Sequence, residues 1–461
     1  MSISLVAFLA LFVLFGLLAF TRPAWGVCLY MLTFFASPPY WWWGRDIATY
    51  RWNLYGGVGL LIAVLISRSV NPNSNQPVTA KTRRLITLAT LLLINATAVH
   101  FLLSRNWGVS FGSYELVAKF VLLFFMMIAA IRTERDFKLV IMTLIIGMGY
   151  IGWEATINDR GKMVAGRLEG VGAPGATQAN ELASLAVTII PLAGAFFMAG
   201  SRYQKFTAFL AAPFILNVIL LCNSRGAFLS MIASGVAFAA FAPKAIRWRA
   251  FKLLCLGGVA VWLLLGDPEI VQRFMTSFTS SEELDSSASS RLQYWKAGIR
   301  MISDYPLGAG GFGFKRVHGP KYIKEVNDQD FDGRSVHNGY INETCEWGIQ
   351  GFLLKMLFVT TGLFVLRQTI NHCTRQGRTN EALYGCGIAA CMTAFLGTCM
   401  FGDRLDAEWG FWMMALIVAY SRIYGPSFQQ FGRPQQLQQI PQNQNVPVVP
   451  GMQQPVASPQ Y

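Results

Sequence analysis

Charged residues are scarce in this chain of 461 residues. Asp, Glu, Lys and Arg together make up 13% of it, whereas 53% of it is hydrophobic. A soluble globular domain has about 25% charged residues, so an ordinary soluble fold is excluded. The net charge of +14 would suit a nucleic-acid-binding protein. However, the basic residues lie mainly in short loops between apolar segments, which is how membrane topology is fixed, and we expect no nucleic acid partner.

Cysteine and histidine are too few and too scattered to indicate a disulfide framework or a zinc site. The chain has eight cysteines and four histidines, and no cluster of them has the spacing of zinc ligands. Four cysteines lie inside apolar segments, as small core residues: Cys28, Cys255, Cys386 and Cys391. The run from Asp328 to Gly333 begins like a calcium loop, but its twelfth position is Gly339 rather than Glu. We therefore expect neither a metal nor a cofactor.

Long apolar runs predict an all-α, polytopic membrane helix bundle of about 12 spans. A spanning helix needs about 20 apolar residues and satisfies its own backbone, whereas the strands of a barrel would alternate polar and apolar residues. The candidate spans are residues 3–20, 24–40, 52–67, 85–103, 115–132, 137–154, 180–199, 205–222, 225–242, 250–266, 347–366, 381–401 and 406–422. The second and third are short and interrupted, so tilted, interfacial and re-entrant arrangements stay open for them.

One long polar interval divides the chain into four predicted parts. These are an N-terminal transmembrane bundle (1–266), a periplasmic catalytic loop with short helices (267–346), C-terminal transmembrane helices (347–424) and a disordered, Gln/Pro-rich cytoplasmic tail (425–461). The basic loops all fall on one side of this arrangement, which the positive-inside rule makes cytoplasmic. The Ser-rich passage 279–290 is expected to be flexible, and Trp41, Trp42 and Trp43 to lie in the outer interfacial belt. The first span lacks a preceding basic region and is expected to be retained.

Four arginines lie at the outer ends of predicted spans, where positive charge is disfavoured: Arg167, Arg225, Arg291 and Arg404. Arginine is suited to binding phosphate because its planar group donates two parallel hydrogen bonds and stays charged. Each arginine alone is as well explained by snorkelling to lipid or by pairing with a neighbour such as Asp403. Arg291 opens a predicted helix whose N-cap is Ser289 or Ser290.

His337 begins the segment predicted to re-enter the membrane, and it is the candidate general base. From its position alone, a capping role is favoured over catalysis. When His337 is considered together with Arg225 and Arg291, a catalytic role is favoured. Asn338 is a candidate to orient the imidazole or to bind a sugar hydroxyl.

Glu346 and Arg316 complete the candidate substrate-binding residues. A carboxylate at the edge of the bilayer is costly and therefore marks a site candidate, although Glu346 could simply pair with Lys355 or Arg316. The run Gly308-Ala-Gly-Gly-Phe-Gly313 fits a dinucleotide-binding pattern, but no strand precedes it. A turn beside the membrane, after Pro306, is the better interpretation.

Four signatures, in order, resemble the O-antigen ligase and O-antigen polymerase superfamily of bacterial envelope glycosyltransferases. They are Asn223-Ser-Arg-Gly-Ala-Phe-Leu229, then Arg291 with Trp295, then Tyr305-Pro-Leu-Gly-Ala-Gly310 with Phe312 and Phe314, then His337-Asn338 with Glu346-Trp-Gly-Ile-Gln-Gly351. The resemblance covers roughly residues 160–420, and the first 150 residues match only as generic spans.

The resemblance implies a metal-independent glycosyltransferase in the bacterial inner (cytoplasmic) membrane, with its active site facing the periplasm. The donor would be a glycan linked to polyprenyl (undecaprenyl) diphosphate, with Arg225 and Arg291 engaging the diphosphate and His337 acting as base on the acceptor hydroxyl. Lipid A-core is the first acceptor expected, as in lipopolysaccharide biosynthesis. A growing polysaccharide or a protein side chain are the alternatives. A transporter of anionic lipid or polysaccharide would also need arginines, but near the bilayer midplane rather than at one face.

Overall fold

The computed structural model describes residues 2–70, 79–244, 246–248, 251–252, 255, 281–327 and 333–426. Within them every regular element is a helix except for one two-stranded antiparallel hairpin, in which Lys162 pairs with Glu169. The elements are α1 (Ile3–Thr21), α2 (Pro23–Phe35), η1 (Pro38–Tyr40), η2 (Trp42–Ile47), α3 (Trp52–Val70), α4 (Ala80–Ala98), η4 (Val99–Leu103), α5 (Trp107–Ala130), α6 (Glu134–Ile157), β1 (Lys162–Val164), β2 (Arg167–Glu169), α7 (Ala179–Ala199), α8 (Arg202–Cys222), α9 (Arg225–Phe241), α12 (Ser281–Asp304), η5 (Gly313–His318), α13 (Gly319–Asn327), α14 (Gly339–Arg375), α15 (Thr379–Cys399) and α16 (Glu408–Tyr424).

The prediction of an all-α polytopic membrane protein is confirmed. Eight helices of the described residues are long and apolar enough to cross a membrane: α1, α4 with η4, α5, α6, α7, α8, α14 and α15. α9 is apolar but shorter, and the described residues do not reach the predicted count of about 12. The predicted span 250–266, the calcium-like run 328–333 and the tail 425–461 lie wholly or largely outside the described residues.

The predicted span 24–40 is wrong beyond Phe35. α2 ends at Phe35, and Pro38 then begins a 3₁₀ helix, because proline cannot donate the backbone hydrogen bond that would continue α2. Trp41 and Trp43 are buried within the protein, whereas Trp42 is exposed. The Trp41 indole donates to the carbonyl of Phe35 at 3.1 Å, and that of Trp43 donates to the hydroxyl of Tyr150 at 3.0 Å. Both buried indole N–H groups therefore have hydrogen-bond partners within the protein, and the interfacial position of this segment stays a prediction.

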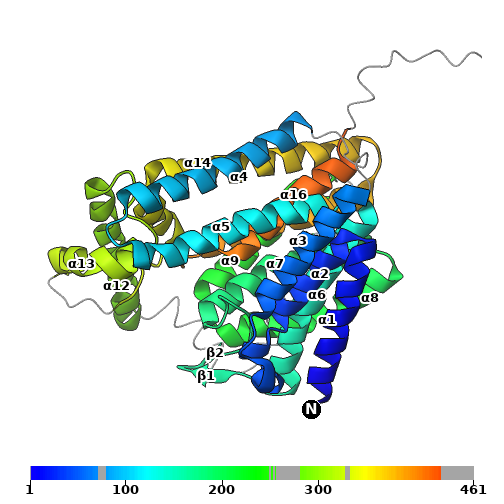
Figure 1. The fold of residues 1–461 in the computed structure, drawn as a ribbon, viewed down its shortest axis with the longest axis horizontal. Helices are drawn as coiled ribbons and strands as arrows, with labels where there is room; N and C mark the ends of the chain where they lie inside the picture. Colours follow the sequence, from blue (N-terminus) through cyan, green and yellow to red (C-terminus); the bar gives the residue numbers. More distant parts are fainter. Residues whose placement is uncertain are drawn as a thin grey trace, which may run out of the picture. The chain divides into compact units, whose positions relative to one another are not determined.

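Helix α15 lies at the centre of the bundle and packs against α7, α9, α14 and α16. Its small side chains let the neighbouring backbones approach closely, which is the main source of attraction between helices in lipid. Cys386 and Cys391 are fully buried on it and Cys28 is buried on α2, as the sequence predicts, whereas Cys255 is exposed and its prediction as a core residue is wrong. Figure 1 shows α4 lying along α14, and these two helices are in contact. The rigid centre of the bundle thus supports the helix ends that carry the polar residues.

The segment between α9 and α14 has a small hydrophobic core of its own. Tyr294, Met301, Phe314 and Tyr322 are buried in it, and Cys345 of α14 closes it. α12 starts at Ser281, so the expected flexible passage 279–290 is largely helical and the expected N-cap at Ser289 or Ser290 is wrong. Serine lowers helix propensity by only tenths of a kcal/mol per residue, so a Ser-rich run does not exclude a helix. This outer segment (281–327) is therefore a folded unit attached to α14.

Helix α14 is interrupted at Gly348, whose φ of 80° and ψ of 170° are not helical. The turn Pro306–Gly310 supplies the missing partners. Ala309 and Gly310 donate their backbone N–H groups to the carbonyls of residues 345 and 346, each at 3.0 Å, and Ile349 donates to the carbonyl of Pro306 at 2.9 Å. The predicted turn after Pro306 is confirmed, and it satisfies the backbone at this break, as a membrane protein requires.

Gly308 is required at the break for two reasons. Its φ is +97°, and a Cβ there would lie 2.7 Å from the carbonyl oxygen of Glu346. We expect Gly308→Ala to destabilise the protein by more than the roughly 1–2 kcal/mol of left-handed strain alone, because the turn must also move away from α14. The measurement is the apparent melting temperature in detergent. Gly333→Ala is the matched control, because Gly333 also has a positive φ (+76°) but no atom within 4 Å of such a Cβ. Equal melting temperatures for the two variants would contradict the packing argument.

Candidate functional site

Three arginines from distant parts of the sequence lie close to one another in the structure. Arg225 is the first residue of α9, Arg167 opens β2, and Arg291 lies midway along α12. Burial lowers the pKa of the Arg291 guanidinium, and the positive charges of Arg167 and Arg225 lower it further. Burial likewise lowers the pKa of Arg167. The three positive charges repel one another in this half-buried place. An anion bound among them would relieve the repulsion, so the cluster suits an anionic ligand.

The local fold places Arg225 at a helix N-terminus. α8 ends at Cys222, and its C-cap Asn223 has a left-handed φ of 44°, a conformation that asparagine tolerates better than most residues. The chain therefore reverses within one residue, and α9 starts at Arg225. The first backbone N–H groups of a helix carry partial positive charge and bind anions. Arg225 thus adds a guanidinium to a position that already favours negative charge.

A polar pair at the start of α7 connects the arginines. Asn180 accepts hydrogen bonds from Arg167 at 2.5 Å and from the hydroxyl of Ser224 at 2.9 Å. Its neighbour Glu181 forms an ion pair with Arg404. Arg167 also donates to the carbonyl of Cys222 at 3.1 Å. Asn180 and Glu181 are not among the residues predicted for the site, although two adjacent polar residues at the start of an apolar span are a signal that points to them.

His337 lies beside the carboxylate of Asp403, with 3.9 Å between its Nδ1 and Oδ2 of the aspartate. Asp403 also accepts a hydrogen bond from the hydroxyl of Ser335 and one from the backbone N–H of Asn338 at 3.1 Å. These bonds hold His337 between them at a φ of 58°, which is strained for a residue other than glycine. The Tyr294 ring, one helical turn after Arg291, has its centroid 6.3 Å from that of His337. The histidine and the arginine cluster therefore lie in one site.

The other predicted site residues are divided between this site and the bundle. Arg404 is half-buried and joins the site through Glu181, so the suggested pairing with Asp403 is not the one formed. The Asn338 side chain caps α14 by accepting from the N–H groups of Tyr340 and Ile341, at 3.0 and 3.2 Å. Asn338 therefore acts first as a helix cap.

Glu346 and Arg316 have partners other than the arginine cluster. The buried Glu346 carboxylate accepts from the hydroxyl of Ser113 at 2.9 Å and from the amide of Asn342 at 3.0 Å. Arg316 is exposed and stacks over the ring of Phe312 at 4.9 Å. Neither of the pairings suggested for Glu346, with Lys355 or with Arg316, is among the ion pairs of the described residues. Glu346 is better placed to anchor α14 to α5 than to bind substrate.

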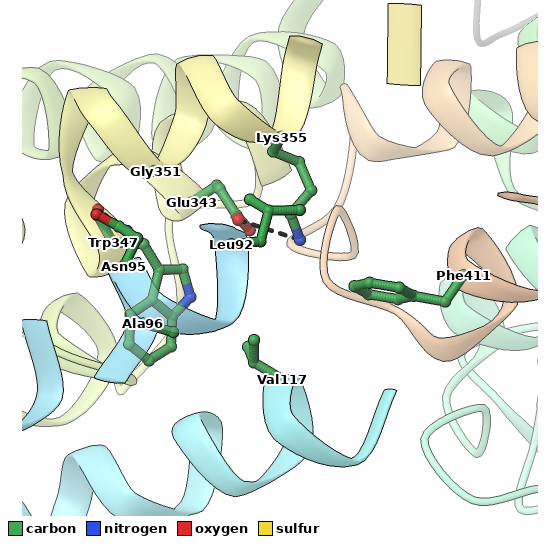
Figure 2. Close-up of a pocket in the computed structure, with 9 residues that line it drawn as sticks. All are labelled: Leu92, Asn95, Ala96, Val117, Glu343, Trp347, Gly351, Lys355 and Phe411. Carbon is green, nitrogen blue, oxygen red and sulfur yellow. Dashed lines mark hydrogen bonds and ion pairs between the residues drawn. The ribbon is translucent and has the colours of Figure 1, made fainter. Parts of the chain in front are cut away.

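Lys355 instead pairs with Glu343 inside the bundle, at 3.1 Å (Figure 2). Both side chains are about 5% exposed, and the lysine also lies over the ring of Phe411 at 5.1 Å. The crevice around this pair has a volume of about 10 Å³, which is room for one water and no more. Removing either partner would leave a buried charge without compensation. This buried pair is therefore structural and not a substrate site.

The described residues hold no group of three or more His, Cys, Asp or Glu side chains that could bind a metal ion. Positive charge at the site comes from guanidinium groups. The arrangement thus provides cations for an anion, and an imidazole next to a carboxylate for proton transfer.

Comparison with known proteins agrees with these features. Residues 206–356 match the model of a protein family described as O-antigen ligase. The match contains Arg225, Arg291 and His337, and it ends within α14. No curated protein matches the chain.

Proposed function

We propose that this chain, a multi-pass membrane protein of the O-antigen ligase superfamily, transfers a glycan from a polyprenyl diphosphate carrier to an acceptor hydroxyl. The family supports a function of the ligase or polymerase type. The single observation that carries the donor assignment is the convergence of Arg167, Arg225 and Arg291. Among the described residues, no carboxylate forms an ion pair with Arg225 or Arg291, so a diphosphate is the anion that this cluster suits best.

The chemistry follows from the two halves of the site. The acceptor oxygen attacks the anomeric carbon of the donor sugar and forms the new C–O bond, while the bond from that carbon to the diphosphate oxygen breaks. His337 takes the proton from the acceptor hydroxyl. The arginines stabilise the negative charge that develops on the leaving diphosphate. Fixed guanidinium groups can meet this charge directly, and we propose a reaction that needs no added metal.

The direct test is transfer by the purified protein in nanodiscs. It is given the lipid-diphosphate-linked glycan extracted from its own bacterium and a candidate acceptor, with and without a chelator. We expect a new glycosidic bond in both conditions, detected as a mass increase of the acceptor. Donor hydrolysis without transfer to any acceptor would contradict the transferase assignment, and loss of activity in the chelator would contradict metal independence.

Asp403 is proposed as a positioning residue for His337. Asp403→Asn keeps the size of the side chain but removes the negative charge facing Nδ1, so the imidazolium formed during transfer loses stabilisation. We expect a fall in kcat of about 10-fold to 100-fold with little change in the KM of the donor, and a shift of the acidic limb of the pH–rate profile to lower pH, because the histidine then loses its proton more readily. A merely structural role would leave the pH profile where it is.

We propose lipid A-core as the acceptor and the periplasmic side of the bacterial inner membrane as the location. The periplasmic location is supported by the arginines and His337, which lie on the opposite side of the bundle from the basic loops. A growing polysaccharide and a protein hydroxyl are the other acceptors that the same site would serve, and an acceptor screen separates the three. The transporter alternative is disfavoured because the break in α14 is occupied by the turn Pro306–Gly310 rather than by charged groups from the site.

A further inference from the structure

A cavity of about 420 Å³ lies between the β1–β2 hairpin and the adjoining ends of α6 and α8. Its volume is within the roughly 300–1,000 Å³ typical of small-molecule sites. The residues that line it include Thr156, Asp159, Arg160, Lys162, Leu168 and Asn217. The proposed reaction does not use any of them.

The lining combines groups that suit sugar hydroxyls. Asn217 donates to the Thr156 hydroxyl at 2.9 Å, so both polar side chains are held in place at the wall. Arg160 lies over the ring of Trp42 at 4.7 Å and 4.0 Å from the Glu154 carboxylate, so its charge is partly compensated. Asp159 adds a carboxylate, whereas Leu168 and Leu221 add apolar surface. A lining with acceptors, donors and an apolar wall matches a carbohydrate, which has hydroxyl edges and C–H faces, better than it matches a phosphate.

The cavity lies on the donor side of the site. Leu168 follows Arg167 directly in β2, and successive residues of a strand point to opposite faces. The contacts run from His337 through Asp403 and its neighbour Arg404 to Glu181, then through Asn180 to Arg167. Arg167 therefore links the site to the hairpin that lines the cavity, because it is the direct neighbour of Leu168 in β2. The acceptor hydroxyl must lie near His337, so it is the donor whose sugars can reach the hairpin.

We propose that the cavity under the β1–β2 hairpin is a carbohydrate subsite for the glycan of the lipid-linked donor, beyond the sugar that reacts. This inference rests on the proposed transfer reaction. The subsite would hold the donor glycan by its own hydroxyls while the arginines hold the diphosphate, so donor selection depends on the sugar sequence as well as on the carrier.

The test uses two probes on the full-length protein in nanodiscs. One is the free glycan released by mild acid from the lipid-linked donor of the same bacterium, and the other is inorganic pyrophosphate. Asn217→Leu and Lys162→Ala alter the cavity, and Lys324→Ala on the exposed side of α13 is the matched surface control. Lys162 is exposed, so its replacement is not expected to disturb folding.

We expect the two cavity variants to weaken free-glycan binding at least 10-fold, to raise the KM of the donor by a similar factor with kcat within twofold, and to leave pyrophosphate binding unchanged. Arg291→Ala should show the opposite pattern, with pyrophosphate binding lost and free-glycan binding kept. Unchanged glycan binding in both cavity variants would overturn the subsite, as would wild-type protein that binds no free glycan at millimolar concentration. If glycerophosphate headgroups bound the cavity and the free glycan did not, the cavity would be a membrane-lipid site and the carbohydrate subsite would be overturned.

The two proposals fail in different ways. Normal transfer together with absent glycan binding would remove the subsite and leave the proposed function intact. If Asn217→Leu weakened glycan binding but the wild-type protein transferred glycan to no acceptor, the carbohydrate site would stand and the proposed transferase function would be rejected.

Discussion

His337→Ala is expected to lower the rate of glycan transfer by about 10²-fold to 10⁴-fold, which is the usual contribution of a general base. The alanine cannot take the proton of the acceptor hydroxyl, and no other imidazole is predicted at the site. Donor binding should persist, because the arginines that face the diphosphate are unchanged. The measurement is the single-turnover rate of transfer, together with the affinity for pyrophosphate.

Two controls keep this result interpretable. His337→Ala also replaces a residue held at a positive φ, so its melting temperature in detergent must be compared with that of the wild type. His372→Ala alters another histidine, in the last turn of α14 and outside the site, and should transfer at the wild-type rate. Transfer by a folded His337→Ala protein at the wild-type rate would remove the histidine from the mechanism.

Arg225→Lys and Arg291→Lys are each expected to reduce kcat by about 10²-fold to 10³-fold, as does loss of one donor that stabilises a developing anion. Lysine keeps the positive charge, but it offers a point charge rather than a planar pair of donors. The loss should therefore appear chiefly in kcat, where the leaving diphosphate acquires its charge.

Arg300→Lys is the matched control for these two variants. Arg300 lies on the same helix as Arg291, but it is exposed and donates to the backbone carbonyl of Glu325 at 2.9 Å. Its replacement should leave kcat within a factor of two. If all three variants kept the wild-type kcat, the arginine cluster would be structural, and the donor assignment would lose its support.

The sequence was most informative about which residues share a side of the membrane. Apolar length and the basic loops predict that Arg225, Arg291 and His337 face the same side, and the structure brings Tyr294 of α12 near His337 and the arginines near one another. The distances come from tertiary contacts, which no periodicity encodes. For example, the sequence does not indicate that Asp403 pairs with His337 rather than with its neighbour Arg404.

Backbone features were the least predictable. Nothing in the composition of α14 indicates a break at Gly348, because glycine is common within membrane helices. The break is stable only because Pro306–Gly310 satisfies its carbonyls and Asn95 of α4 donates to the carbonyl of Trp347 at 2.9 Å. Each of these partners lies at least about 40 residues away in the chain. Similarly, Trp41 and Trp43 have interfacial character by residue type, and only the positions of Phe35 and Tyr150 make them internal.

The attachment of the outer segment to the break in α14 has a consequence for how a long substrate is handled. Detaching the turn Pro306–Gly310 would leave several backbone groups without partners, at about 1–3 kcal/mol for each group that stays out of water. We therefore expect the Pro306–Gly310 end of the outer segment to stay attached to α14 and not to open and close over the site. In the proposed reaction, a glycan of many sugars would pass alongside this fixed segment, so we expect the length of the transferred glycan not to be limited by the volume of an enclosed chamber.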